Sequence, residues 1–197
     1  MQAVREFVNK NKGIFIAALS LFAAGIVLGT IVACSLGAAD SASLKEQLGK
    51  YISVTAAGSV TFGDLLTSRC ADNFRYMLVM VLCAQNVYLL PAGAVCLGIK
   101  GYQLGFAISF VCGNFGTDGI AMSVVTSLFS YAVVMPFYML AFAIAAVYAA
   151  KRRNARSGQK GELAALCAVL AVIYGVLCLA ACAEAFLVPL FVGFFSV

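Results

Sequence analysis

The stretch LAALCAVLAVIYGVLCLAACA, residues 163–183, contains no charged side chain, and Glu184 follows it directly. A helix needs about 20 predominantly apolar residues to cross the hydrocarbon core of a bilayer. The stretch therefore predicts a transmembrane helix. Counted from Leu163 at about 1.5 Å per residue, Glu184 lies roughly 31 Å along it, which places the carboxylate near the far membrane boundary.

The rest of the chain has the same character. It is 63% hydrophobic and 11% charged, with a mean hydropathy of +1.01, whereas a water-soluble domain carries about 25% charged residues. Further runs without charge cover 14–39, 77–99, 102–117 and 119–150. We expect an all-α integral membrane protein, a single membrane domain over residues 1–197, with five spans near 14–36, 76–98, 99–117, 124–150 and 163–188.

The basic residues predict the orientation of these spans. Of the thirteen Lys and Arg residues, three lie near the N-terminus, one is Lys100 between spans two and three, and five lie in the loop 151–162. An odd number of spans brings these segments to one side, which the positive-inside rule makes cytoplasmic. The N-terminus is then inside and the C-terminus outside. The outside soluble loop is 38–75, with short helices expected near 44–52 and 62–69, the second running on into span two.

Two glycine patterns bear on how the spans pack. In GIKGYQLGF, residues 98–106, three glycines predict a tight hairpin between spans two and three, with Lys100 at the cytoplasmic boundary. In span one, small residues recur every fourth position, which favours close helix packing. That stripe contacts either another subunit or a later span of the same chain, and it comprises Gly25, Gly29, Ala33 and Gly37.

Polar side chains near the spans need ionic or hydrogen-bond partners. Glu184 needs a counter-ion, and Arg69 or Arg75 in the outside loop is the expected one. Gln85 and Asn86 precede Pro91 and are expected to hydrogen-bond within the bundle or to carbonyls released near the proline.

Catalysis and metal binding find little support in the sequence. The chain has no histidine to act as a base near neutral pH. Seven of the eight cysteines fall in predicted spans, where they act as small apolar residues, and Cys70 lies alone in the loop. Cys178 and Cys182 are interpreted as packing residues, and Cys34 also fits a loose lipoprotein cleavage pattern. We expect no enzyme activity, no cofactor, no metal and no nucleic-acid partner.

Three patches together resemble the stage II sporulation protein M family. They are NFRYMLVMVL at 73–82, GIKGYQLGF at 98–106 and CAEAFLVP at 182–189. The residues that match the family pattern are Asn73, Arg75, Tyr76, Lys100, Gly101, Gly105, Phe106, Glu184, Ala185, Phe186 and Pro189. Span four departs from the pattern, because Phe129, Ser130 and Tyr131 stand where polar residues are expected before its proline.

The resemblance implies a five-span bacterial membrane protein that is not itself a hydrolase. It implies a scaffold that recruits two peptidoglycan-cleaving partners, sporulation proteins D and P, for septal wall thinning and engulfment during endospore formation. The location would be the bacterial cell membrane, at the septal or engulfing membrane of a sporulating cell. Membrane lipid and further copies of the chain are the other expected contacts.

Two other functions stay open at this point. One is a small transport component, such as the substrate-binding subunit of a vitamin importer, although those subunits usually have six spans and a polar pocket. The other is an ion carrier or channel that uses Glu184, Gln85 and Asn86.

Overall fold

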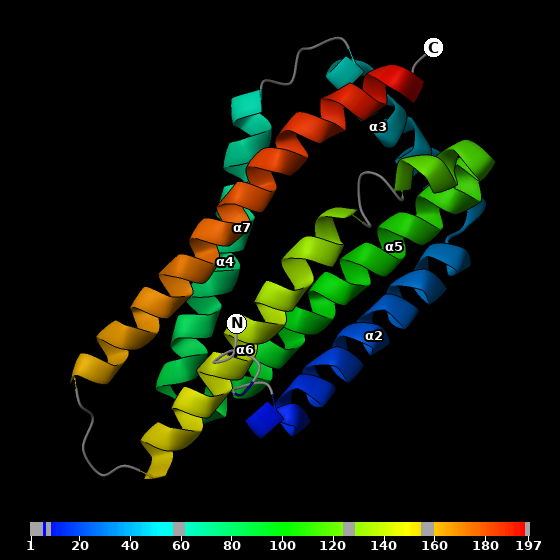
Figure 1. Cartoon of the computed structure of the whole chain (residues 1–197). Coiled ribbons are helices and arrows are strands. Elements are labelled where there is room, and N and C mark those ends of the chain that lie inside the picture. The colour runs from blue at the N-terminus through cyan, green and yellow to red at the C-terminus, as the bar shows by residue number, and fades with distance from the viewer. Residues whose placement is uncertain (1–5, 7–8, 57–61, 124–128, 155–159, 196–197) are drawn as a thin grey trace.

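The computed structural model describes residues 6, 9–56, 62–123, 129–154 and 160–195. Within these ranges the chain is almost entirely helical and has no strand, which confirms the predicted all-α class. Five long helices lie alongside one another and α3 lies across one end of them (Figure 1). The elements are α2 (Lys12–Ser35), α3 (Ala38–Ala56), α4 (Phe62–Gln85), η1 (Val87–Leu89), α5 (Leu90–Ser123), α6 (Phe129–Asn154) and α7 (Lys160–Phe195).

Four helices in the described part of the chain are long and apolar enough to cross a membrane, at Lys12–Ser35, Val87–Asn114, Tyr131–Arg152 and Leu163–Phe186. The protein is therefore an all-α, multi-pass membrane protein. The sequence predicted five such spans, and the difference is α4. Its charged residues lower its hydropathy, but it packs against α6 and α7 within the same bundle (Figure 1).

The hairpin predicted at 98–106 is wrong, because α5 runs without a break from Leu90 to Ser123. The chain reverses instead at Asn86, whose backbone is extended and whose side-chain Oδ1 accepts a hydrogen bond from the Tyr88 N–H at 3.1 Å. Pro91 lies in the first turn of α5, where a missing N–H costs no helical bond. The predicted spans 76–98 and 99–117 are thus replaced by α4 and α5.

The glycines of 98–106 have another role, which is to let α5 touch α2. A Cβ built on Gly101 would lie 2.3 Å from the Phe22 carbonyl oxygen, and one on Gly105 would lie 2.2 Å from the Ile26 carbonyl oxygen. The α2 glycines fit α5 in the same way, because a Cβ on Gly25 or Gly29 would meet α5 backbone at 2.2 Å. Only residues without a side chain allow two backbones to approach this closely.

This glycine seam between α2 and α5 identifies the partner of the predicted stripe as a later helix of the same chain. The two helices run in the same direction (Figure 1), and Ser109 Oγ donates to Thr30 Oγ1 at 3.1 Å farther along. The stripe is shorter than predicted. Ala33 is only half-buried, and Gly37 follows the end of α2 at Ser35, with nothing nearer to a built Cβ than Asp40 Oδ2 at 3.8 Å.

The outside loop forms the predicted helices, with longer bounds. The first occupies all of α3, and the second is the start of α4, which runs on into the bundle as expected. From α3, Ser41 Oγ donates to Asn114 Oδ1 at 3.2 Å and Lys45 Nζ donates to the Asn114 carbonyl at 3.3 Å. These bonds hold α3 to α5.

Two of the three predicted basic segments have described residues at one end of the bundle, whereas Lys100 lies within it. The start of α2 and the end of α6 lie at this end (Figure 1). Arg152 lines a cavity of about 220 Å³ together with Gln85 and Asn86. The two amides therefore lie at the connection between α4 and α5 and not in the interior of the bundle.

The glycine seam can be tested with Gly105→Ala. The added Cβ would collide with rigid backbone, and such overpacking costs about 1–3 kcal/mol. We expect the purified protein in detergent to unfold at a lower temperature than the parent. Gly175→Ala on α7 is the matched control, because a Cβ there meets nothing within 4 Å. Equal unfolding temperatures for both variants would contradict the seam.

Candidate functional site

The three sequence patches that carry the resemblance meet at one place between α4, α5, α6 and α7. The first contributes Asn73 and Tyr76, the second Lys100 and the third Glu184. A cavity of about 40 Å³ lies among these side chains. We call this group the polar cluster, and its members are Arg69, Asp72, Asn73, Tyr76, Lys100, Tyr138 and Glu184.

The lone acid at the end of the apolar stretch has the partner that the sequence predicted. Arg69 Nη2 lies 2.7 Å from Glu184 Oε1, with the two side chains 50% and 13% exposed. The other expected partner, Arg75, does not reach Glu184. Its Nη1 lies 3.5 Å from Asp72 Oδ1, one turn earlier on the same helix. The Arg69–Glu184 pair thus joins α4 to α7.

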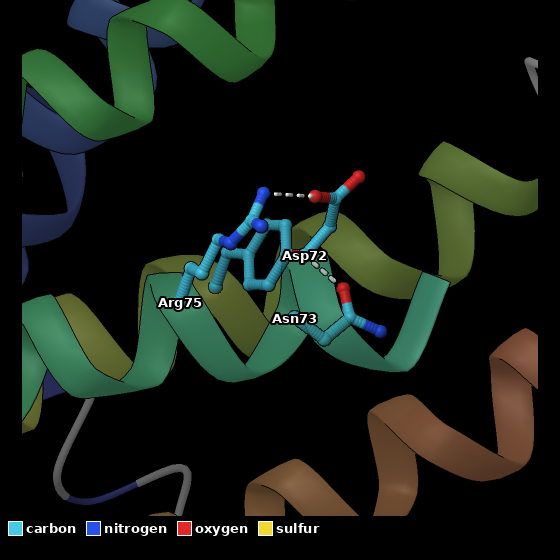
Figure 2. A network of polar contacts seen from close by, with 4 residues as sticks. Asp72, Asn73 and Arg75 are labelled. Carbon is cyan, nitrogen blue, oxygen red and sulfur yellow. Dashed lines mark hydrogen bonds and ion pairs between the residues drawn. The ribbon is translucent and has the colours of Figure 1, made fainter. Parts of the chain in front are cut away.

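Asn73 is the buried polar centre of the cluster and is 8% exposed. Its Oδ1 accepts a hydrogen bond from the Tyr138 hydroxyl, and its Nδ2 donates to the Leu177 carbonyl at 3.4 Å. One amide therefore connects α4 to both α6 and α7. Figure 2 shows the Asn73 side chain projecting from α4. A buried amide without partners would cost several kcal/mol in hydrocarbon, so these bonds stabilise the helix arrangement.

The Tyr76 side chain adds a second bond between α4 and α6. Its hydroxyl donates to the Tyr138 carbonyl at 3.3 Å, and the two rings lie 4.1 Å apart between centroids. Within the described residues, every buried side-chain nitrogen or oxygen has a hydrogen-bond partner. The interior of the cluster is thus fully bonded.

Lys100 lies in the bundle and not at a membrane boundary, which corrects the prediction made from the glycine pattern. It is ten residues into α5, about 15 Å along the helix from Leu90. Its Nζ lies 5.8 Å from the centroid of the Tyr138 ring, within the range of a cation–π contact. Lys100 therefore ties α5 to α6 beside the cavity.

The remaining residues of the family pattern do not enter the cavity. Gly101 and Gly105 belong to the seam with α2, and Phe106 is half-buried on the same helix. Ala185 is buried beside Glu184, at 2% exposure. The chain does not turn at Pro189, because α7 continues through it to Phe195; the side chain of Pro189 lies outside the described part.

Sequence reasoning missed two tyrosines of α6 that line the cavity, Tyr131 and Tyr138. They are seven residues apart, so they lie two turns apart on one helix face. That spacing of two hydroxyls in an apolar span was the available signal. The sequence analysis instead treated the neighbourhood of Tyr131 as a departure from the family pattern.

The polar groups of the cluster bond to one another in ways that hold helices together. Among the described residues, no group of three or more His, Cys, Asp or Glu side chains is placed to hold a metal ion, and no disulfide joins the cysteines. Glu184 also lies far from Gln85 and Asn86, which line a separate cavity, so these three do not form one site.

Comparisons with protein-family models, curated proteins and solved structures find no match for this chain.

The Arg69–Glu184 pair can be tested by a double-mutant cycle with Arg69→Gln and Glu184→Gln. Because Arg69 is half exposed, we expect a coupling energy of about 1–2 kcal/mol, below that of a fully buried pair. Denaturant unfolding in detergent measures it. The control cycle uses Asp72→Asn and Arg75→Gln, an exposed pair expected to couple by less than about 0.5 kcal/mol. A coupling energy no larger than the control's would contradict the proposed link.

The role of Asn73 can be tested with Tyr138→Phe, which leaves the Asn73 amide oxygen without its donor. The expected loss of stability is about 1–3 kcal/mol, measured in the same unfolding assay. Tyr88→Phe is the control, because the Tyr88 side chain is 90% exposed and should tolerate the change. A Tyr138→Phe protein as stable as the parent would show that the hydrogen bond contributes nothing.

Proposed function

We propose that this protein is a membrane scaffold for peptidoglycan-remodelling enzymes. In an endospore-forming bacterium these partners would be sporulation proteins D and P, recruited to thin the septal wall and drive engulfment. The observation that supports the proposal is the convergence of three separate sequence patches on one polar cluster. The cluster joins α4, α5, α6 and α7 through mutual bonds, as a platform with a fixed helix arrangement requires.

The surfaces of the bundle suit such a role. α3 and the start of α4 lie at the end opposite the basic segments, which is the outer side in the predicted orientation (Figure 1). There they could meet enzymes that act on the wall. Along the bundle, exposed apolar side chains on α2 and α7 are available to lipid or to the membrane anchor of a partner, and include Ile16, Leu28, Ile31, Val172 and Leu179.

The importer alternative gains less support from the geometry. A pocket for a drug-sized or vitamin-sized ligand has about 300–1,000 Å³, whereas the polar cavity has about 40 Å³. A hollow of about 380 Å³ between α4 and α7 is lined almost entirely by apolar side chains, which offer little to orient a polar vitamin. The polar cavity lined by Gln85, Asn86 and Arg152 has about 220 Å³, which is below that range.

A complementation experiment tests the scaffold. We expect expression of this chain to restore engulfment in an endospore-forming host that lacks its own family member, scored by membrane-dye microscopy. The tagged chain, isolated from those membranes, should carry both wall hydrolases at well above the level of a tag-only control. Asn73→Leu should reduce the recovery of the hydrolases, because it removes the hydrogen bonds that join α4 to α6 and α7. Gly175→Ala should not reduce it. Recovery of both hydrolases at background level would refute the proposal.

A further inference from the structure

Cysteine side chains from two helices meet where α4 packs on α7. From its position in the sequence, Cys70 has no cysteine partner, and Cys178 and Cys182 read as packing residues of the last span. In the structure, Cys70 lies in the first half of α4, and its thiol shares a hydrogen bond with the thiol of Cys178 on α7. Cys182 follows one helical turn later on the same face of α7. The tertiary structure thus pairs two thiols that are far apart in the sequence.

Contacts on both sides of Cys70 hold this pair in place. The Tyr174 hydroxyl donates to the Cys70 carbonyl at 3.4 Å and makes a side-chain hydrogen bond with Cys178. Almost one turn later on α4, Asn73 Nδ2 donates to the Leu177 carbonyl at 3.4 Å. These bonds fix how α4 lies along α7. The two thiols therefore face each other because of the helix packing and not through a chance side-chain rotation.

The setting of these thiols differs from that of a purely structural cysteine. Cys83 is 1% exposed, and its Sγ donates to the Leu89 carbonyl at 3.0 Å, so it is enclosed and bonded to backbone. Cys70, Cys178 and Cys182 are each half-buried, so a reagent can reach them from one side. A metal ion does not explain the group, because no described cluster of such ligands is placed to hold one.

The pair also lies at the end of the bundle where disulfides are chemically stable. Cys70 is next to Arg69, whose partner Glu184 is expected near the outer membrane boundary. The start of α4 lies at the end opposite the start of α2 and the end of α6 (Figure 1), which is the outer side in the predicted orientation. Disulfides form and persist outside the bacterial cytoplasm, whereas thiols stay reduced within it.

We propose that Cys70 and Cys178 form a dithiol site that a disulfide-bearing oxidant, of the thiol oxidoreductase class, converts into a disulfide between α4 and α7. One thiolate attacks a sulfur of the oxidant's disulfide and forms a mixed disulfide. The second thiolate then displaces the oxidant's sulfur and closes the bond between the helices. The oxidant takes up the two electrons, and the two thiol protons end on its two sulfurs.

The proposed disulfide would lie beside the bonds that already join α4 to α7. It would connect these helices covalently next to the Arg69–Glu184 pair and close a loop that includes α5 and α6. A disulfide that closes a long loop restricts the unfolded chain and stabilises the fold. This modification site does not depend on the proposed function, because it requires only the two thiols and an oxidant.

Oxidised glutathione, a small disulfide, is the probe for the reaction. Burial raises the pKa of the Cys70 thiol to about 11, and because the thiolate is the attacking species, the reduced full-length protein is treated at mildly alkaline pH. Remaining thiols are then alkylated and the chain is digested with trypsin. Cleavage after Arg69 and Arg75 releases peptide 70–75, and cleavage after Lys160 releases the α7 peptide. We expect these two peptides to be joined, and to separate when a reductant is added.

Three serine variants identify the partner of Cys70. Cys178→Ser should lose the joined peptide. Cys182→Ser should keep it, and so should Cys167→Ser, the matched control with an exposed thiol on the same helix. No joined peptide in the treated parent would overturn the proposal. A joined peptide that persists in Cys178→Ser at the parent's yield would overturn the assignment to this pair.

Thermal unfolding in detergent gives a second readout that does not depend on peptide recovery. We expect the oxidised parent to unfold about 5–15 °C above the reduced parent, because a disulfide across a long loop stabilises the fold. In Cys70→Ser the same treatment should leave the unfolding temperature unchanged. An equal shift in the parent and in Cys70→Ser would overturn the proposed disulfide, because the stabilisation would then come from another reaction.

The state of the pair in living cells tests the role of the oxidant. Cells that express the chain are quenched in acid, which stops thiol exchange, and their free thiols are alkylated before digestion. We expect the joined peptide in the parent and not in Cys178→Ser. Full alkylation of Cys70 and Cys178 in quenched cells would overturn the modification, even if oxidised glutathione forms the disulfide in detergent.

Discussion

A polar side chain inside a bilayer has no water to bond with, and the arrangement of this bundle depends on that constraint. α4 brings an amide and charged groups among apolar helices, and they are stabilised only where the neighbours supply partners. Asn73 bonds to α6 and α7, and Arg69 pairs with Glu184 of α7. These bonds specify which faces of α4, α6 and α7 meet, whereas apolar packing alone would tolerate many rotations.

The second constraint is the close approach of α2 and α5. Gly101 and Gly105 bring α5 against the backbone of α2, and Lys100 directs its ammonium toward Tyr138 of α6. Neighbouring residues on a helix point about 100° apart, so one short segment serves both contacts. α5 thereby links the α2 seam to the group of α4, α6 and α7. In GIKGYQLGF, the glycines lie on the face of α5 that contacts α2, and the lysine lies on the face directed toward α6.

The scaffold proposal follows from how the polar groups are bonded. Those inside the cluster are satisfied by one another, which suits a structural role. The exposed charges at the edge of the cluster, Asp72 and Arg75, pair with each other. A bundle whose polar groups are bonded to one another has the fixed helix arrangement expected of a platform.

The sequence by itself determined the membrane class, the all-α fold, the glycines of the small-residue stripe and two candidate partners for Glu184, between which the structure selects Arg69. These follow from composition and from the high cost of a lone charge in lipid, which are properties of short segments. Only the tertiary structure decided that 98–106 is helical, that Lys100 lies within the bundle and that Tyr138 completes the site. Glycine permits a turn and a close helix contact equally well, and the choice between them depends on whether the backbone of α2 lies opposite.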